Sequence, residues 1–205
     1  MPEDKSLFFY GGLFHWLFDR PLAEGRQVVT DLIPEGSSVL DIGSGTGLLC
    51  GALAAKNCRV IGLDLSLRML RYAQKYNRYN DVRFVHGDAT DLSDFPDHSF
   101  EYATLLFVLH ELPRETQVRV LREAVRVAST LVMVDATVPL PKNAGARGIR
   151  LVESTFGRDH YPNFKAFLAG GGIMGALEAA ALPATVSHRS VFWRDCREVV
   201  VASRV

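Results

Sequence analysis

The stretch V-L-D-I-G-S-G-T-G-L-L at residues 39–49 runs from an apolar, β-branched segment through a glycine-rich turn into helix-favouring residues. Gly43, Gly45 and Gly47 permit a tight turn and let a ligand approach the backbone closely. Their spacing is G-x-G-x-G, and Leu48 stands where the dinucleotide pattern G-x-G-x-x-G requires its third glycine. No G-x-x-x-x-G-K-[ST] phosphate loop occurs in the sequence. The stretch therefore predicts a strand, a ligand-binding turn and a helix.

Further apolar runs on either side of this unit alternate with helical patterns. Such alternation is typical of a parallel sheet covered by helices, whose strands are apolar throughout because both of their faces are buried. We expect strands at residues 38–42, 59–63, 82–85, 102–107 and 131–134. We expect helices at residues 47–55, 66–76 and 113–127, with Ser66 as an N-cap and Pro113 in a first turn.

The rest of the chain follows a different pattern. Residues 136–148 contain two prolines and two glycines, which is typical of a connection that leaves the edge of a sheet. Residues 163–181 have a helical pattern interrupted by glycines at 170–172, so two short helices are expected. Residues 184–193 and 197–205 predict two strands, which must be antiparallel neighbours because their connection is so short.

Composition limits the possible partners. The chain has 205 residues, 48% of them hydrophobic, with 23 basic and 23 acidic side chains, which predicts one domain spanning 1–205. A balanced charge provides no general attraction for phosphates, so we expect a small-molecule partner and no nucleic acid. Three cysteines without C-x-x-C spacing are typical of a reducing compartment. The apolar run at residues 7–18 is shorter than the ~20 residues that span a bilayer.

These features, together with the lack of a basic region before that run, predict a cytoplasmic protein without an integral membrane segment. Peripheral contact with a membrane and the oligomeric state are left open by the sequence.

Two carboxylates fall where a nucleoside ligand would need them. Asp64 ends the second predicted strand, where a carboxylate can accept hydrogen bonds from ribose hydroxyls. Asp88 follows the third, at the edge of the sheet where ligands of open α/β sheets bind. With no phosphate loop in the chain, the expected ligand is an adenosine without phosphates.

Four motifs resemble those of the class I S-adenosylmethionine-dependent methyltransferases. They are D-I-G-S-G-T-G at residues 41–47, G-L-D-L-S at 62–66 with Met69 after it, G-D-A at 87–89, and S-F-E-Y followed by L-H-E-L within 99–112. They occur in the family's order and spacing, and the resemblance covers most of residues 35–136. The chain departs from the family pattern at Glu101, where an aspartate is usual, and at residues 128–130, where P-G-G is common.

The resemblance implies a Rossmann-like α/β fold, in which a seven-stranded sheet has an antiparallel last strand and helices on both faces. It also implies S-adenosyl-L-methionine as the cofactor. Asp41 can balance the cationic part of such a cofactor in a partly dry cleft. The resemblance implies that the methionine part is held by Asp41, Gly43, Ser44, Gly45 and Gly47. Asp64 would hold the ribose hydroxyls, and Leu65 and Met69 would flank the adenine. Asp88 and the Ala89 backbone would meet the edge of the adenine, and Gly87 and Leu106 are the remaining implied cofactor residues.

Methyl transfer by direct displacement needs above all a well-positioned acceptor, since effective molarities of ~10⁵–10⁸ M can come from orientation alone. A general base is required only for an acceptor that arrives protonated. His110, which follows the fourth strand, and Asp135, which ends the fifth, are the candidates. Alternatively, His110 caps a loop or lines the cofactor pocket. A cluster at residues 159–161 is a further candidate that is also typical of a polar surface loop.

Several motifs that the sequence lacks narrow the range of possible methyl acceptors. The sequence has no Pro-Cys pair for covalent cytosine methylation, and L-L-F-V at residues 105–108 replaces the N-P-P-Y motif of amino methylation. No acidic cluster typical of a magnesium site is evident, so no metal is expected.

Specificity should lie outside the shared motifs. Residues 1–30 are predicted to form an aromatic lid and residues 137–182 a substrate cap, with Tyr10, Phe14, His160 and Tyr161 contacting an apolar or aromatic acceptor. Alternatively, both segments are amphipathic helices packed on the sheet. The N-terminal pattern also resembles quinone and phospholipid methyltransferases. Two other functions remain open: a catalytically silent cofactor-binding module, and an NAD-dependent oxidoreductase or epimerase, which Leu48 disfavours.

Overall fold

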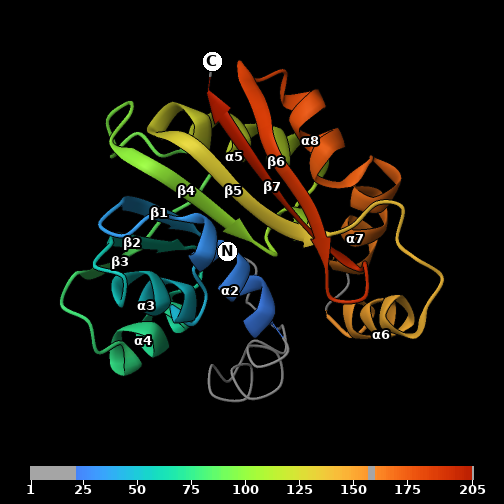
Figure 1. Ribbon diagram of the computed structural model, residues 1–205, viewed down its shortest axis with the longest axis horizontal. Coiled ribbons are helices and arrows are strands. Elements are labelled where there is room, and N and C mark those ends of the chain that lie inside the picture. The colour runs from blue at the N-terminus through green and yellow to red at the C-terminus, as the bar shows by residue number, and fades with distance from the viewer. Residues whose placement is uncertain (1–21, 157–159, 205) are drawn as a thin grey trace.

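The computed structural model describes residues 22–156 and 160–204, and within them a seven-stranded sheet has the order β3-β2-β1-β4-β5-β7-β6 (Figure 1). The strands β1 to β5 are parallel, and β7 is antiparallel to both β5 and β6. This confirms the predicted fold class, including the antiparallel last strand. The strands are β1 Ser38–Ile42, β2 Arg59–Asp64, β3 Val82–His86, β4 Phe100–Leu106, β5 Ala128–Ala136, β6 Ala184–Phe192 and β7 Arg197–Arg204.

Helices cover both faces of this sheet, as Figure 1 shows. On one face α5, α6, α7 and α8 contribute to the larger hydrophobic core, and on the other face α2 and α3 contribute to the smaller one. The helices are α2 Ala23–Leu32, α3 Leu48–Ala54, α4 Leu67–Tyr76, the short 3₁₀ helix η3 Leu109–Glu111, α5 Arg114–Val127, α6 Ala144–Glu153, α7 His160–Ala169 and α8 Gly172–Ala180.

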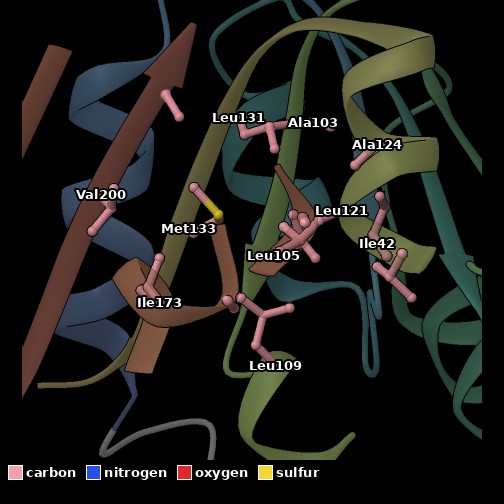
Figure 2. Packing of buried hydrophobic residues seen from close by; sticks show 14 of the residues in the cluster. Ile42, Ala103, Leu105, Leu109, Leu121, Ala124, Leu131, Met133, Ile173 and Val200 are labelled. Carbon is pink, nitrogen blue, oxygen red and sulfur yellow. The ribbon is translucent and has the colours of Figure 1, made fainter. Parts of the chain in front are cut away.

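Alternate side chains along a strand belong to different hydrophobic cores. On β5, Leu131 and Met133 belong to the larger core, while Val132 and Val134 belong to the smaller one. Successive strand side chains point to opposite faces, so a strand in the middle of the sheet needs mostly apolar side chains on both faces. Figure 2 shows Met133 near Ile173 of α8 in the larger core.

The predicted strands and helices are present with small shifts at their ends. Ser66 caps α4, where its hydroxyl accepts a hydrogen bond of 3.4 Å from the Met69 N–H, as predicted. The fourth strand ends at Leu106 rather than at residue 107, because Phe107 has a φ of 60° and leaves the extended conformation. The helical pattern after residue 160 divides into α7 and α8 at the predicted glycines.

The two segments that were predicted to bind the acceptor are described in part. Tyr10 and Phe14 lie outside the described residues. Within the second segment, Phe164 and Phe167 of α7 are fully buried in the larger core. Those two phenylalanines therefore pack in the core, while the lid and cap as such stay a prediction. None of the helices in residues 22–156 and 160–204 is long and apolar enough to cross a membrane.

Candidate functional site

The predicted cofactor and catalytic residues converge at one edge of the sheet. The strands β1 to β5 are parallel, so their carboxyl ends and the loops that follow them meet there. The glycine-rich turn follows β1, Asp64 ends β2, Asp88 follows β3 and His110 follows β4. The edge thus carries the predicted cofactor residues beside the predicted catalytic residues.

The glycine-rich turn is tied to the end of β2. The backbone N–H groups of Gly43 and Ser44 donate to the Leu63 carbonyl at 2.8 and 3.0 Å. A side chain at Gly43 would place its Cβ 2.6 Å from Val108, so only glycine fits this close approach. Gly45 has a φ of 53° and nothing within 4 Å of a Cβ position, so the turn presents open backbone to a ligand.

Ser44 is the polar side chain of this turn. Its hydroxyl oxygen is buried and has no hydrogen-bond partner among the described residues. Buried polar groups are nearly always hydrogen-bonded, so an orphaned hydroxyl in a ligand-binding turn calls for a partner from outside the chain. The turn therefore offers both open backbone and an unused polar group.

Asp64 links the turn to helix α4. One of its oxygens accepts a hydrogen bond of 2.8 Å from the Gly45 N–H, and the other accepts one of 2.8 Å from the Ser66 N–H. Burial raises the pKa of Asp64, and the hydrogen bonds from Ser66 and Gly45 counteract this effect. An ionised carboxylate has about four acceptor sites, so each oxygen can still accept a ligand hydroxyl.

Residues beside Asp64 differ in their exposure. Leu65 is 69% exposed, which is unusual for a large apolar side chain and leaves it free to cover a flat ligand. Asp88 is also exposed, and its carboxylate accepts a hydrogen bond from the Thr90 N–H at 2.8 Å. Met69 is 5% exposed, whereas Gly87, Ala89 and Leu106 are partly buried. The predicted contact from Met69 would use only a small part of its surface.

Asp41 is buried in the sheet directly before the turn. Its carboxylate accepts hydrogen bonds from the Thr104 hydroxyl at 2.7 Å and from the Cys50 thiol at 3.2 Å. Burial raises the pKa of Asp41 to about 6, although both hydrogen bonds lower it. The carboxylate is therefore mostly ionised at neutral pH, and its charge lies in a poorly solvated place where a nearby cation would be attracted strongly.

His110 and Asp135, the predicted catalytic pair, contact each other. His110 Nδ1 lies 2.8 Å from Asp135 Oδ1, and the His110 backbone N–H donates to Asp135 Oδ2 at 3.2 Å. Both side chains are buried. The structure thus brings together two residues that the sequence had placed at the ends of neighbouring strands.

Two residues from the second half of the chain complete this cluster. Glu153, the last residue of α6, places Oε2 2.6 Å from His160 Nε2 and 3.6 Å from His110 Nε2. Burial of the ring lowers the pKa of His110, but Asp135 and Glu153 outweigh this effect and raise it to about 10. A protonated imidazole cannot accept a proton, which favours the alternative in which His110 caps a loop or lines the cofactor pocket over the role of general base.

Arg197, at the start of β7, is a partly buried cation beside the cluster. Its guanidinium lies 4.6 Å from the centre of the Phe107 ring, and its Nη1 has no hydrogen-bond partner among the described residues. Burial lowers the pKa of Arg197, whereas the charges of Asp135 and Glu153 raise it. Sequence reasoning missed Arg197 and Glu153, because neither lies in a motif.

Tyr161, the last predicted substrate residue, is partly buried and its ring stacks on Phe164 with centroids 6.4 Å apart. Its predicted contact with an acceptor stays a prediction, as do those of Tyr10 and Phe14.

Known proteins similar in sequence to this chain are methyltransferases. Residues 39–130 match the family described as a methyltransferase domain. The demethylmenaquinone methyltransferase of Bacillus licheniformis is 38% identical over 99 residues, which cover 46% of this chain and 41% of that protein. A cypemycin N-terminal methyltransferase from Streptomyces is 29% identical over 180 residues, covering 83% and 72% of the two chains.

Solved structures share the fold. A methyltransferase from Aquifex aeolicus superposes with a TM-score of 0.66 at 20% identity, covering 95% of this chain and 99% of that one. The magnesium protoporphyrin IX methyltransferase of Synechocystis, solved with bound SAH, superposes with a TM-score of 0.61 at 18% identity, covering 91% and 83% of the two chains.

The matched part of this chain spans about two fifths of the length of the demethylmenaquinone methyltransferases it is similar to. The match includes the glycine-rich turn and the ends of the first four strands, and the solved structures share the fold. The comparisons therefore support a place for this chain in the class I S-adenosylmethionine-dependent methyltransferase superfamily.

Proposed function

We propose that this chain binds S-adenosylmethionine and transfers its methyl group to a small, apolar or aromatic acceptor by direct displacement. The observation that carries the proposal is the position of Asp64. Its carboxylate is hydrogen-bonded to the glycine-rich turn on one side and to the first turn of α4 on the other. This holds an acceptor of ribose hydroxyls between the open backbone at Gly45 and the exposed side chain of Leu65.

The residues present fit the cofactor. The unpartnered Ser44 hydroxyl and the open Gly45 backbone would hold the methionine part, with the Asp41 carboxylate behind them as a buried negative charge. Asp64 would hold the ribose, while Leu65 and Asp88 would lie beside the adenine. The bound cofactor supplies an activated methyl group on a sulfonium.

The chain itself would position the acceptor and exclude water from the reaction. A displacement reaction gains most from holding the acceptor in line with the methyl group and from excluding water. The buried His110 and Phe164 and the partly buried Arg197 would lie on the acceptor side of the cofactor residues. Because carboxylates hold His110 in its protonated form, it would orient an acceptor oxygen or nitrogen by donating a hydrogen bond.

Relatives point to two acceptor types. The demethylmenaquinone methyltransferases are named for a quinone acceptor, and the Streptomyces relative for the N-terminus of cypemycin. An aromatic acceptor agrees with the apolar walls that Phe156, Phe164 and Tyr161 provide near His110 and His160. We therefore favour a hydroquinone or phenol over a peptide amine.

Isothermal titration tests the cofactor. We expect the purified chain to bind S-adenosylhomocysteine with a Kd in the micromolar range or below, and not to bind NAD. Asp64→Ala should weaken binding at least tenfold, whereas Asp94→Ala, at an exposed aspartate away from the site, should leave it unchanged. Binding of NAD in place of S-adenosylhomocysteine would contradict the proposal.

Transfer is tested with a radiolabelled methyl donor. Hydroquinones, phenols, peptide N-termini and lipid headgroups would be offered in parallel, and we expect label in the first two groups. Tight binding of S-adenosylhomocysteine without transfer to any of them would support the silent cofactor-binding module instead.

A further inference from the structure

We propose that His110, Glu111 and His160 form a binding site for a divalent transition-metal ion beside the proposed cofactor site. One nitrogen of each histidine and one carboxylate oxygen of Glu111 all lie within 4.8 Å of one another. The two imidazole rings are 5.5 Å apart between centroids and nearly perpendicular, at 86°. Ligand atoms around a zinc ion lie about 2.0–2.2 Å from it, so small side-chain movements would close this set on one ion.

The second nitrogen of His110 is occupied in the way that metal-binding histidines usually show. His110 Nδ1 lies 2.8 Å from the Asp135 carboxylate, which leaves Nε2 directed toward His160 and Glu153. Metal-ligating histidines almost always donate their other N–H to a carboxylate or carbonyl, which fixes the tautomer and raises the basicity of the ligand. Asp135 is thus placed to orient His110 rather than to bind the ion.

Glu153 supplies a second, independent observation. Its Oε2 lies between the two imidazoles, 2.6 Å from His160 Nε2 and 3.6 Å from His110 Nε2. The same helix exposes 68% of Leu151 and buries Glu153 to 5% exposure, which reverses the usual burial of apolar and charged residues. A chain buries a carboxylate in place of a leucine only where that carboxylate is paired, so Glu153 is a candidate fourth ligand.

Charge at this point also favours a divalent cation. The carboxyl groups of Asp135, Glu153 and Glu111 gather around the two imidazoles, and the Arg197 guanidinium is the cation beside them. Carboxylates outnumber the guanidinium at this point, and a divalent ion would offset that excess.

The backbone that carries the ligands is held in place. Gln117 is buried and donates hydrogen bonds to the carbonyls of Leu109, the first residue of η3, and Leu112, the residue after it, at 3.0 and 2.9 Å. Asn163 of α7 donates to the Glu111 carbonyl at 2.7 Å, which joins the element that carries His160 to the element that carries His110 and Glu111. Such support is what a preorganised metal site requires.

The side chains also determine how solvent reaches the proposed site and which type of ion it would bind. His110 is buried, His160 is partly buried and Glu111 is exposed, so the cluster opens to solvent on the Glu111 side. Two imidazoles with carboxylates suit Zn²⁺ or Fe²⁺, whereas Mg²⁺ and Ca²⁺ prefer oxygen ligands alone. If the proposed methyl transfer is correct, the ion would lower the pKa of an acceptor hydroxyl bound to it.

The test measures metal binding directly on the full chain without S-adenosylhomocysteine. Protein stripped with a chelator would be titrated with Zn²⁺ in competition with a chromophoric chelator, and Co²⁺ would report the coordination through its visible absorption. We expect one equivalent of Zn²⁺ with a Kd below micromolar and a Co²⁺ spectrum typical of nitrogen and oxygen ligands.

Variants assign the ligands. His160→Ala and Glu111→Gln should each weaken Zn²⁺ binding at least tenfold, and Asp135→Asn should weaken it about 10- to 100-fold through His110. His188→Ala and Glu115→Gln change an exposed histidine and an exposed glutamate elsewhere and should have no effect. Circular dichroism would confirm that each variant is folded, and a variant that is not folded would be replaced by His160→Gln.

Either absence of a stoichiometric Zn²⁺ site or unchanged affinity in folded His160→Ala and Glu111→Gln overturns the metal site. Titration of the stripped protein with S-adenosylhomocysteine separates the two proposals. Normal cofactor binding without metal binding removes the metal site alone, whereas metal binding without cofactor binding removes the proposed methyl transfer alone.

Discussion

Thr104 and Asp41 are register partners on the adjacent strands β4 and β1, and the Thr104 hydroxyl donates a hydrogen bond of 2.7 Å to the Asp41 carboxylate inside the sheet. The Cys50 thiol is the second donor to this carboxylate. Desolvation nevertheless prevails and raises the pKa of Asp41 to about 6. The protein thus keeps a carboxylate in a place that costs stability, directly beneath the turn that we propose binds a cationic cofactor.

The raised pKa of Asp41 predicts a pH-dependent penalty. A carboxyl group whose pKa rises from 3.8 to about 6 on folding favours the folded state fully below pH 3.8 and loses this contribution by about pH 6. Asp41→Asn cannot ionise, so the stability of the native protein relative to the variant should fall by about 2 kcal/mol between pH 4 and pH 6. Urea unfolding at both pH values measures it, and a pH-independent difference would contradict the assigned shift.

Removing the hydroxyl of Thr104 should destabilise the protein when Asp41 is ionised. Thr104→Val leaves a buried carboxylate with one donor fewer, which we expect to cost about 1–3 kcal/mol at pH 8 and less at pH 4. Thr130→Val is the matched control, because Thr130 is a partly buried strand residue whose hydroxyl pairs with the uncharged Ser203 hydroxyl at 3.2 Å. Urea unfolding at pH 8 should show the larger loss of unfolding free energy for Thr104→Val. Equal losses for the two variants would contradict a stabilising role of this hydrogen bond for the Asp41 carboxylate.

Much of the sheet could be predicted because strands buried on both faces are nearly continuous apolar runs, and β1 and β2 begin at the predicted residues. The end of β4 could not, since Phe107 continues the apolar run while its φ of 60° ends the strand. The glycine-rich turn and Asp64 were predictable from local motifs, because their spacing along the chain fixes their geometry.

The acceptor side required the structure. His110 and His160 are 50 positions apart and meet only because α7 packs against η3, an arrangement that no local pattern encodes. Glu153 was hidden for a second reason, since hydropathy predicts that Leu151 is buried and Glu153 exposed, whereas the structure shows the reverse. Such conflicts between local preference and structure concentrate at functional sites.

Two aromatic residues one turn apart on α7 should separate stability from acceptor binding. Phe164 is fully buried against His110, with ring centroids 5.7 Å apart, so Phe164→Ala should cost about 3–5 kcal/mol through the cavity it leaves. Tyr161 is only partly buried, so Tyr161→Ala should cost less and should mainly raise the KM for the acceptor. Thermal unfolding and steady-state kinetics measure both, and a large stability loss for Tyr161→Ala would assign it to the core.

A pair of glycines distinguishes a ligand contact from backbone strain. Gly45 and Gly36 both have a positive φ, 53° and 80°, and neither has an atom within 4 Å of a Cβ position. Alanine should therefore cost about 1–2 kcal/mol of conformational strain at either position. Only at Gly45 would the new methyl group also intrude on the open backbone of the proposed cofactor turn. We expect Gly45→Ala to weaken S-adenosylhomocysteine binding at least tenfold and Gly36→Ala to leave it unchanged, with similar losses of stability. Equal affinities in calorimetry would mean that the cofactor does not approach this turn.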